Sequence, residues 1–380
     1  MHDVSIAPCN TYHPSELRAA LERALGLLDF DIPRGVRVLV KPNAVTNNRP
    51  EQATATHPAV VDAVCGLLAD ASCDITIGDS SAYWFPGYTR AAFEALGVGE
   101  VARRHGAALV CFEELPFRIL ERPGFPEAPR LFVADTSAWD LVINLPKLKV
   151  HRTTRISAAV KNLFGLVPGA TKARYHELLA GRHDYLDRFG AVIYDTYKAV
   201  QPGLSILDAV VSLERDGPAA NGDPRRTRFV MASRDALALD TALCGVIGEQ
   251  VGAVTYLREA LRRGELDPAA VRLLGAVPTV GFVTLEDQPR AGRLQRRAKG
   301  AMFQHLTVRP SVDPARCQRC GACAERCQLD AIRLDPTATI HPDACVWCYG
   351  CVPVCEAGAL ALRPSRANRA LQGVRKLTGM

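Results

Sequence analysis

The sequence predicts an α/β protein with a mainly parallel sheet and helices on both faces, followed by a small C-terminal α+β domain. Two patterns lead to this fold class. Up to Phe282, short apolar runs alternate with segments of helical periodicity, as in sheets buried between two layers of helices. After residue 310, eight of the thirteen cysteines gather in two runs. So short a segment cannot bury a hydrophobic core of normal size, and it therefore needs additional cross-links to be stable.

The apolar runs give the expected strands in chain order. They lie at residues 36–40, 74–78, 108–112, 141–145, 205–207, 229–231 and 281–283. Between them, the spacing of the apolar residues from Val60 to Leu68 predicts a helix. The longest apolar stretch, residues 236–257, contains Asp240 and Glu249, so we expect a buried helix there and no membrane span.

Composition and charge set the domain organisation. The 380 residues suffice for two or three domains at roughly 150 residues each. We expect an α/β domain at 1–287, a basic linker at 288–310, a second domain at 311–362 and a basic tail at 363–380. The linker and tail hold more positive charge than the net +6 of the whole chain, so the remainder is slightly acidic. This distribution argues against nucleic-acid binding, which needs a basic face on a folded domain.

The first residues and the use of cysteine indicate in which compartment the protein is located. The first residues lack the basic start and apolar run of a signal peptide, and no apolar stretch is long enough to cross a bilayer. We therefore expect a cytoplasmic protein without a transmembrane segment. In that compartment the cysteines are expected to be metal ligands or buried apolar residues and not disulfides.

The two cysteine runs carry the strongest chemical signal. Each has three cysteines spaced every third residue and a fourth after three more residues. Thiolates spaced in this way hold [4Fe–4S] clusters, and in two-cluster ferredoxins the fourth cysteine ligates the other cluster. We therefore predict two [4Fe–4S] clusters. The first is assigned to Cys317, Cys320, Cys323 and Cys355, and the second to Cys345, Cys348, Cys351 and Cys327.

An internal repeat supports this interpretation. Asp313-Pro-Ala-Arg-Cys is echoed by His341-Pro-Asp-Ala-Cys, 28 residues later, and Gly321 and Gly350 are expected to let each ligand loop curl. Zinc is the rival metal, but it prefers paired cysteines that close one four-ligand site. The segment resembles bacterial two-cluster ferredoxins, which implies a ferredoxin-like iron–sulfur domain. It departs from them where Gln328 and Glu356 replace the usual proline, and this leaves the ligands intact.

Polar residues follow several predicted strands of the large domain. Ligands bind beyond the carboxyl ends of parallel strands, so these residues form a candidate anion site. We assign proton transfer and charge stabilisation to Lys147, Lys149, His151 and Asp79. We assign substrate binding to Lys41, Asn43, Ser80, Ser81, Asn144, Lys161, Asn162 and Glu214.

Other interpretations of these polar residues remain open. The lysines could be solvated, and Asn43 and Asp79 could simply cap turns. The histidines His57, His151 and His176 could bind a divalent metal with Asp79, although their spacing fits no metal motif. The stretch 165–172 is glycine-rich but lacks P-loop spacing, and no dinucleotide fingerprint is present. Many flavin sites have no short signature, so flavin stays possible without positive support.

Several motifs in series resemble the family called domain of unknown function 362, over roughly residues 4–282. They are Lys41-Pro-Asn, Thr56-His-Pro, Gly78-Asp-Ser, Asn144-Leu-Pro-Lys-Leu-Lys-Val-His, Lys161-Asn-Leu-Phe-Gly, Glu214, Gly217-Pro, Ser233-Arg-Asp and Asp240. The resemblance implies an α/β fold with an associated two-cluster ferredoxin module and leaves the substrate open. Val150 and Arg215 depart from the residues common in this series.

Three functions are consistent with these features. In the first, a ferredoxin-dependent reductase, the clusters feed electrons to an anionic small molecule or an unseen cofactor in the α/β domain. In the second, an electron carrier or adaptor docks a redox partner without substrate chemistry of its own. In the third, the clusters are structural. We favour the reductase because covalent fusion keeps the clusters near the domain that they would serve. Its expected partners are a soluble electron donor or acceptor protein and an anionic small molecule, and the oligomeric state is left open.

Overall fold

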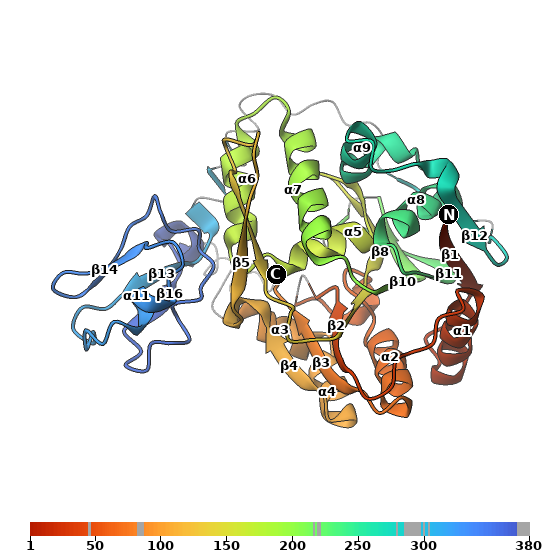
Figure 1. Ribbon diagram of the computed structural model, residues 1–380, viewed down its shortest axis with the longest axis horizontal. Helices are drawn as coiled ribbons and strands as arrows, with labels where there is room; N and C mark the ends of the chain where they lie inside the picture. The colour runs from red at the N-terminus through yellow and green to blue at the C-terminus, as the bar shows by residue number, and fades with distance from the viewer. Residues whose placement is uncertain are drawn as a thin grey trace.

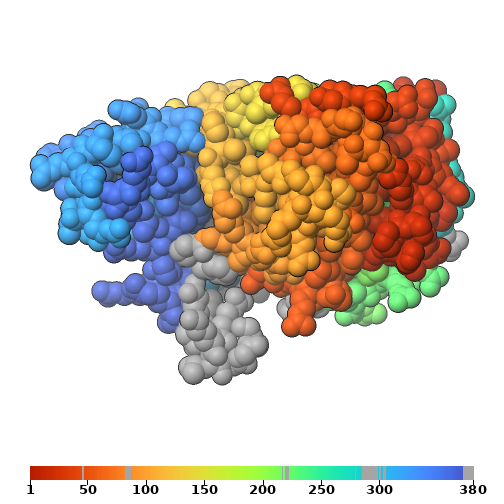
Figure 2. Space-filling view, turned by 90° about the horizontal axis from the view of Figure 1, so that it is seen from below, coloured from red at the N-terminus to blue at the C-terminus, as the bar shows by residue number. Residues whose placement is uncertain are grey.

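The computed structural model describes residues 1–44, 47–81, 87–215, 217–218, 222–278, 280–284, 298, 301–302 and 305–370. Most of the predicted basic linker and half of the tail therefore lie outside the described residues. A large α/β part and a small C-terminal part lie side by side (Figure 1). The space-filling view shows the C-terminal part, in blue, packed against one end of the α/β part (Figure 2).

A ten-stranded sheet forms the centre of the α/β part, with the order β12-β1-β11-β10-β7-β2-β3-β4 and with β8 and β9 off this path. The strands are β1 (His2–Pro8), β2 (Arg37–Pro42), β3 (Asp74–Asp79), β4 (Ala108–Cys111), β7 (Leu141–Leu145), β8 (Lys147–His151), β9 (Arg155–Ser157), β10 (Leu204–Glu214), β11 (Asp223–Ser233) and β12 (Val271–Leu274). Along the main path only β11 runs antiparallel to its neighbours. The predicted mainly parallel α/β sheet is confirmed.

Helices cover both faces of this sheet, and the strands alternate between two hydrophobic cores. In β2, Val38 and Val40 face one core while Leu39 faces the other. The first core lies under α1 (Pro14–Leu27), α2 (Pro58–Asp70), α3 (Tyr88–Ala95) and α4 (Val98–His105). The second lies under α5 (Ala159–Asn162), α6 (Thr171–Ala180), α7 (Tyr185–Val200), α8 (Ala236–Ile247) and α9 (Thr255–Arg262). This alternation is the burial pattern that continuous apolar strands predict.

Several elements differ from the sequence prediction. The expected strand at 281–283 is wrong: residues 281–284 form no strand, and the sheet ends instead at β12. The expected single helix at 236–257 is two helices, because Gly248 adopts φ +73° and ends α8. A hairpin of β5 (Phe117–Glu121) and β6 (Arg130–Ala134), which the prediction missed, packs on α7. Short 3-10 turns lie at Pro50–Gln52, Phe112–Glu114, Leu163–Leu166, Val251–Ala253 and Pro268–Ala270.

Between Arg309 and Arg363 the C-terminal part contains two short antiparallel ribbons and a short helix. Strand β13 (Arg309–Val312) pairs with β16 (Leu360–Arg363), β14 (Ile332–Leu334) pairs with β15 (Ala338–Ile340), and α11 spans Ala322–Arg326. The sequence repeat is also a backbone repeat, because left-handed residues recur 28 positions apart. The pairs are Arg319 with Trp347, Gly321 with Tyr349, and Asp330 with Gly358. Gly321 therefore curls its loop as expected, whereas in the second loop Tyr349 adopts this conformation in place of Gly350.

Candidate functional site

The carboxyl ends of β2, β3 and β7 meet at one edge of the sheet, as parallel strands require. There the Lys41 ammonium lies 2.8 Å from the Asp79 carboxylate, and both side chains are almost completely buried. Asp79 also accepts backbone hydrogen bonds from Ala44 and Ser80, each at 2.8 Å. This carboxylate therefore fixes two loops and neutralises one lysine at the centre of what we call the strand-end site.

Three buried asparagines connect the strands of the site. Asn43 donates to the side-chain oxygen of Asn162 at 2.7 Å, and Asn162 donates to that of Asn144 at 2.8 Å. Asn144 in turn donates to the carbonyl of Ala159, the first residue of α5. Because each amide is held on both sides, the network ties β2, β7 and α5 together.

The start of α5 is held by one buried carboxylate. Asp240 accepts hydrogen bonds from the backbone nitrogens of Ala159 (2.7 Å) and Val160 (3.0 Å) and from the Tyr256 hydroxyl (2.9 Å). Burial raises the pKa of Asp240 to about 7, although these three donors act in the opposite direction. Asp240 thus positions the helix that supplies Lys161 and Asn162 to the site.

A second ion pair lies where β8 meets β10. The Lys147 ammonium is 2.8 Å from Asp208 and 2.8 Å from the hydroxyl of Tyr12. Tyr12 and the backbone nitrogen of His57 both donate to Asp208, and the rings of Tyr12 and His57 stack at 3.7 Å. Asp208 lies within β10, which continues to Glu214.

Among the described residues, Lys149 donates hydrogen bonds only to neutral acceptors. Its ammonium donates to the side-chain oxygen of Asn43 at 2.8 Å and to the carbonyl of Thr54 at 2.6 Å. Burial is the largest cause that lowers the pKa of Lys149 to about 7, and the neighbouring charges of Lys161 and Lys147 contribute to the same shift. At neutral pH this side chain therefore exchanges a proton readily.

Two further lysines lie beside this group. Lys161 of α5 is partly buried, with its ammonium 5.0 Å from the centre of the Phe164 ring. Lys172 of α6 donates to the Ser80 hydroxyl at 2.9 Å and to the Val167 carbonyl at 2.7 Å. Burial is the main cause that lowers the pKa to about 7 for Lys161 and about 8 for Lys172. The charges of Lys172 and Lys41 also contribute to the lowered pKa of Lys161.

Lys172 was missed by the sequence analysis, which examined the stretch 165–172 only as a P-loop. The available signal was Gly165, whose missing side chain lets the 3-10 turn at Leu163–Leu166 approach the ion pair of Lys41 and Asp79. A Cβ at this position would overlap the Asp79 carboxylate and stand 2.6 Å from the Lys41 nitrogen. The glycine brings the chain close to the site, and the following helix then delivers Lys172.

Five lysines thus surround two buried aspartates. Among the described residues Lys149, Lys161 and Lys172 make no ion pair with a carboxylate, whereas Lys41 and Lys147 do. Buried cations without counter-charges are costly, and their lowered pKa values express that cost. A bound anion would supply the missing charge, so the site has the electrostatics of an anion receptor.

The remaining predicted residues lie at its borders. Ser81 is buried; its backbone nitrogen donates to Thr89, and its hydroxyl donates to the Ala44 carbonyl. His151 shares the face of β8 with Lys147 and Lys149, but its ring nitrogen accepts from the Thr153 backbone at 3.1 Å. Glu214 lies at the end of β10, where it accepts from the Val283 nitrogen and lies 3.7 Å from Arg225.

The histidines of the alternative metal site lie at different places in the structure. His57 stacks on Tyr12, whereas His176 stacks on Phe189 at 4.2 Å in the second core. Within the part of the chain that the structure describes, no three His, Cys, Asp or Glu side chains converge as they would on a single metal ion.

The eight C-terminal cysteines line two separate cavities. One is lined by Cys317, Cys320, Cys323 and Cys355, and the other by Cys327, Cys345, Cys348 and Cys351. Each cavity thus takes three cysteines from one run and the fourth from the other. All eight are free of disulfides. Backbone nitrogens donate to three of the sulfurs: Ala338 to Cys317, Ala331 to Cys327 and Leu360 to Cys355, at 3.3–3.5 Å. Amide donors of this kind surround the thiolates of iron–sulfur clusters, so the residues fit such a group.

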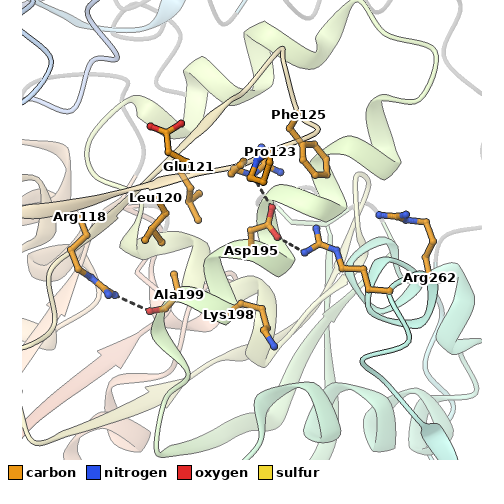
Figure 3. Close-up of a pocket in the computed structure, with 12 residues that line it drawn as sticks. Arg118, Leu120, Glu121, Pro123, Phe125, Asp195, Lys198, Ala199 and Arg262 are labelled. Atoms are coloured by element: carbon orange, nitrogen blue, oxygen red, sulfur yellow. Dashed lines mark hydrogen bonds and ion pairs between the residues drawn. The ribbon is translucent and has the colours of Figure 1, made fainter.

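A different and more open cavity, of about 650 Å³, lies between the β5–β6 hairpin and helices α7 and α9 (Figure 3). Asp195 lies between Arg122 and Arg263, at 2.7 Å from each, and Arg118 reaches the carbonyl of Ala199. No predicted site residue lines it. Asp195 already pairs with two of the arginines that line this cavity, so the cavity differs in charge from the strand-end site. It also lies at a different place in the fold.

Comparisons with known proteins bear on identity. The family described as a domain of unknown function, DUF362, matches residues 38–245, and a 4Fe-4S binding domain matches residues 310–333. The chain is 36% identical over 282 residues to a protein of Synechocystis sp. described as thylakoid-associated protein sll1697, covering 71% of this chain and 82% of that protein. No solved structure matches significantly.

These findings settle the predicted architecture and the general role. Among the described residues no helix has the length and apolar character needed to cross a membrane. The 4Fe-4S match confirms an iron–sulfur electron-transfer role, as the cysteine spacing predicted. The family match covers more than half of the chain, including every lysine of the strand-end site. The chain therefore belongs to the DUF362 family and carries a C-terminal iron–sulfur domain.

Proposed function

We propose that this protein is an iron–sulfur oxidoreductase in which two [4Fe–4S] clusters feed electrons to an anionic small molecule, or to a further cofactor, at the strand-end site. Cluster I would be held by Cys317, Cys320, Cys323 and Cys355, and cluster II by Cys345, Cys348, Cys351 and Cys327. When bound, such clusters supply one electron each. The two four-cysteine cavities support this assignment, since a cubane spreads its thiolates around a core.

The observation that carries the proposal is the direct connection between the loop of cluster II and the strand-end site. The nitrogen of Ala170 donates to the Trp347 carbonyl, and the Thr171 hydroxyl donates to the Val346 carbonyl, both at 2.9 Å. The next residue is Lys172, whose ammonium contacts Ser80. A single turn of α6 thus joins the cysteine loop to the lysines.

The approach of the two parts depends on Gly169. Its φ is +52°, and a Cβ there would lie 2.7 Å from the Cys348 carbonyl and 2.8 Å from the Tyr349 ring. Only a glycine accommodates both the left-handed backbone and this close contact. The packing that brings cluster II to the α/β part is therefore built into the chain.

The lysines supply the chemistry at the receiving end. Lys149, Lys161 and Lys172 would hold the anionic group and stabilise the negative charge that develops when the substrate is reduced. Their lowered pKa values, about 7, 7 and 8, suit proton delivery at neutral pH. Lys41 and Lys147, each paired with a buried aspartate, would help to hold the groups around them in place.

The outer side of the C-terminal part offers an entry for electrons. Cys320 is exposed, whereas Cys348 and Cys351 are half-buried. A soluble donor protein would therefore reduce cluster I first, and the electron would then pass inward through cluster II. A cytoplasmic location remains our prediction for this chain, and the description of the Synechocystis relative as thylakoid-associated concerns that protein.

Anaerobic reoxidation experiments test the proposal. The clusters are reduced with dithionite, excess reductant is removed, and organic anions (carboxylates, enolates and phosphate esters) are added singly while the cluster absorbance is followed. We expect at least one anion to reoxidise the clusters in the wild type and to do so at least tenfold more slowly in Lys149→Met. Lys198→Met is the matched control, because Lys198 is 45% exposed and pairs with Glu265.

Either of two results would contradict the proposal. If no member of the panel accepts electrons while an added redox protein does, the chain is an electron carrier. If Lys149→Met and Lys198→Met react alike, the lysines of the strand-end site do not take part.

A further inference from the structure

Two arginines lie against the ring of Trp347, which follows Cys345 and precedes Cys348 in the ligand loop of cluster II. The guanidinium of Arg174, on α6 of the α/β part, is 5.2 Å from the centre of this ring. The guanidinium of Arg309, on β13 of the C-terminal part, is 4.4 Å from it. Trp347 itself is buried. Both parts of the molecule therefore place positive charge beside the loop that would hold cluster II.

Helix α6 connects this charge to the strand-end site. Lys172, two residues before Arg174, donates to the Ser80 hydroxyl in that site. Because an α-helix has 3.6 residues per turn, side chains two positions apart leave it on nearly opposite sides. The Ala170 nitrogen, which donates to the Trp347 carbonyl at 2.9 Å, holds the loop at the start of the helix. The first turn of α6 thus serves the lysines on one side and the loop of cluster II on the other.

The charge of Arg174 is only partly accessible to water. Its guanidinium lies 2.7 Å from the carboxylate of Glu177, and the two side chains are 23% and 16% exposed. Charges in such positions are screened less than charges on the open surface, so they act on their neighbours more strongly. Burial raises the pKa of the Cys345 thiol, whereas the charges of Arg174 and Arg309 act in the opposite direction. Both arginines therefore favour negative charge on a ligand of cluster II.

Burial and positive charge have opposite effects on an iron–sulfur cluster. A [4Fe–4S] cluster with four thiolates becomes more negative on reduction, so poor solvation lowers its reduction potential and a nearby cation raises it. Burial raises the pKa of Cys348 to about 11 and that of Cys351 to about 12, whereas Cys320 of cluster I is exposed. Burial therefore makes cluster II harder to reduce, and a cation beside it offsets this effect.

We propose that Arg174 raises the reduction potential of cluster II and so keeps this buried cluster reducible by cluster I. The inference deepens the proposed function, on which it rests, by naming the residue of the α/β part that controls the inward passage of electrons. In this step one electron passes from cluster I, which is oxidised, to cluster II, which is reduced, and no proton moves and no bond forms or breaks. A one-electron donor then reduces cluster I again; it is dithionite in the test and a donor protein in the cell.

A redox titration of the anaerobically purified full-length holoprotein, followed by electron paramagnetic resonance, measures the midpoints of the two clusters. Arg174→Met removes the charge and keeps most of the side-chain length. It should lower one midpoint, so that the ratio of reduced to oxidised cluster at a fixed potential falls at least threefold, a shift of about 30 mV for a one-electron couple. Arg174→Lys keeps the charge and should change this ratio less than twofold.

Glu177→Gln should give a shift of the opposite sign. It removes the counter-charge of Arg174, so the same midpoint should rise and the ratio should increase at least twofold. A mere disturbance of packing would not move the midpoint upward in one variant and downward in the other. Arg262→Met is the matched control, because Arg262 also pairs at 2.7 Å with a glutamate three positions away, Glu259, but on α9. Neither midpoint should change in this variant.

Arg319→Met identifies the midpoint of the other cluster. The Ala338 amide is the largest cause that lowers the pKa of Cys317 in cluster I, and the charge of Arg319 contributes to the same shift. Arg319→Met should therefore lower the midpoint that Arg174→Met leaves unchanged.

Three results would overturn the proposal: both midpoints unchanged in Arg174→Met, shifts of the same sign in Arg174→Met and Glu177→Gln, or one and the same midpoint lowered by Arg174→Met and Arg319→Met. If Arg174→Met does not keep its iron, the sign of the shift in Glu177→Gln decides. In each of these cases the anion test with Lys149→Met still decides the proposed function separately.

Discussion

Replacing Lys149 by methionine should change how the stability of the protein depends on pH. Lys149 is 2% exposed and its ammonium is held by two neutral oxygens, so among the described residues its charge is buried without a counter-ion. Methionine keeps the length of the side chain and removes the titration. The prediction therefore concerns the difference between wild type and variant at two pH values, because the lost hydrogen bonds contribute equally at both.

The magnitude follows from the lowered pKa. A fall from 10.5 to about 7 corresponds to a cost of roughly 5 kcal/mol for charging this lysine in the folded protein. Between about pH 7 and pH 9 the unfolded chain keeps the proton and the folded chain loses it, so the free energy of unfolding rises with pH. This contribution amounts to about 2 kcal/mol over that interval, and Lys149→Met should lack it.

Urea denaturation of the full-length holoprotein under anaerobic conditions, followed by far-ultraviolet circular dichroism, measures the difference. The stability of the wild type relative to Lys149→Met should increase by about 2 kcal/mol from pH 7 to pH 9. Lys198→Met, at a lysine that is 45% exposed, should show no such change. Parallel pH profiles for wild type and Lys149→Met would refute the electrostatic account of the strand-end site.

Three further predictions address other parts of the molecule. Cys320→Ser should reduce the bound iron to about four atoms per chain, because it removes a ligand of cluster I alone; loss of all iron on elemental analysis would contradict the assignment. Gly169→Ala should leave the iron content intact and slow reoxidation by the strand-end acceptor at least tenfold, since its Cβ would lie 2.7 Å from the Cys348 carbonyl; an unchanged stopped-flow rate would show that this contact is dispensable. Asp240→Asn should lower the thermal midpoint in calorimetry by roughly 5 °C, because one acceptor for the start of α5 is lost, and an unchanged midpoint would contradict this role.

The sequence was informative where the pattern is local and periodic. The continuous apolar runs at β2, β3, β4 and β7 located four neighbouring strands of the sheet, because a strand covered on both faces needs apolar residues at every position. The prediction of a strand at 281–283 was wrong. A short apolar run alone does not distinguish a strand from an irregular segment, such as this one, that passes the end of β10. There the Val283 nitrogen bonds to Glu214 instead of to a strand.

The candidate site was predictable in its members but not in their pairing. The predicted strand ends identified Lys41, Asp79 and Asn144 as site residues, because the parallel topology alone brings them to one edge of the sheet. Whether a lysine is neutralised depends on which carboxylate folds against it, and the contact of Lys147 with Asp208 joins residues 61 positions apart. The position of Lys172 in the site depends on the close approach of Gly165 to the ion pair of Lys41 and Asp79. No local sequence pattern reveals this contact.

Iron and acid-labile sulfide analysis of anaerobically purified protein tests the central claim most directly. The account predicts about eight of each per chain, as two [4Fe–4S] clusters require. Zinc in place of iron, or about four irons with the second cysteine run unligated, would contradict the transfer of electrons through two clusters to the strand-end site.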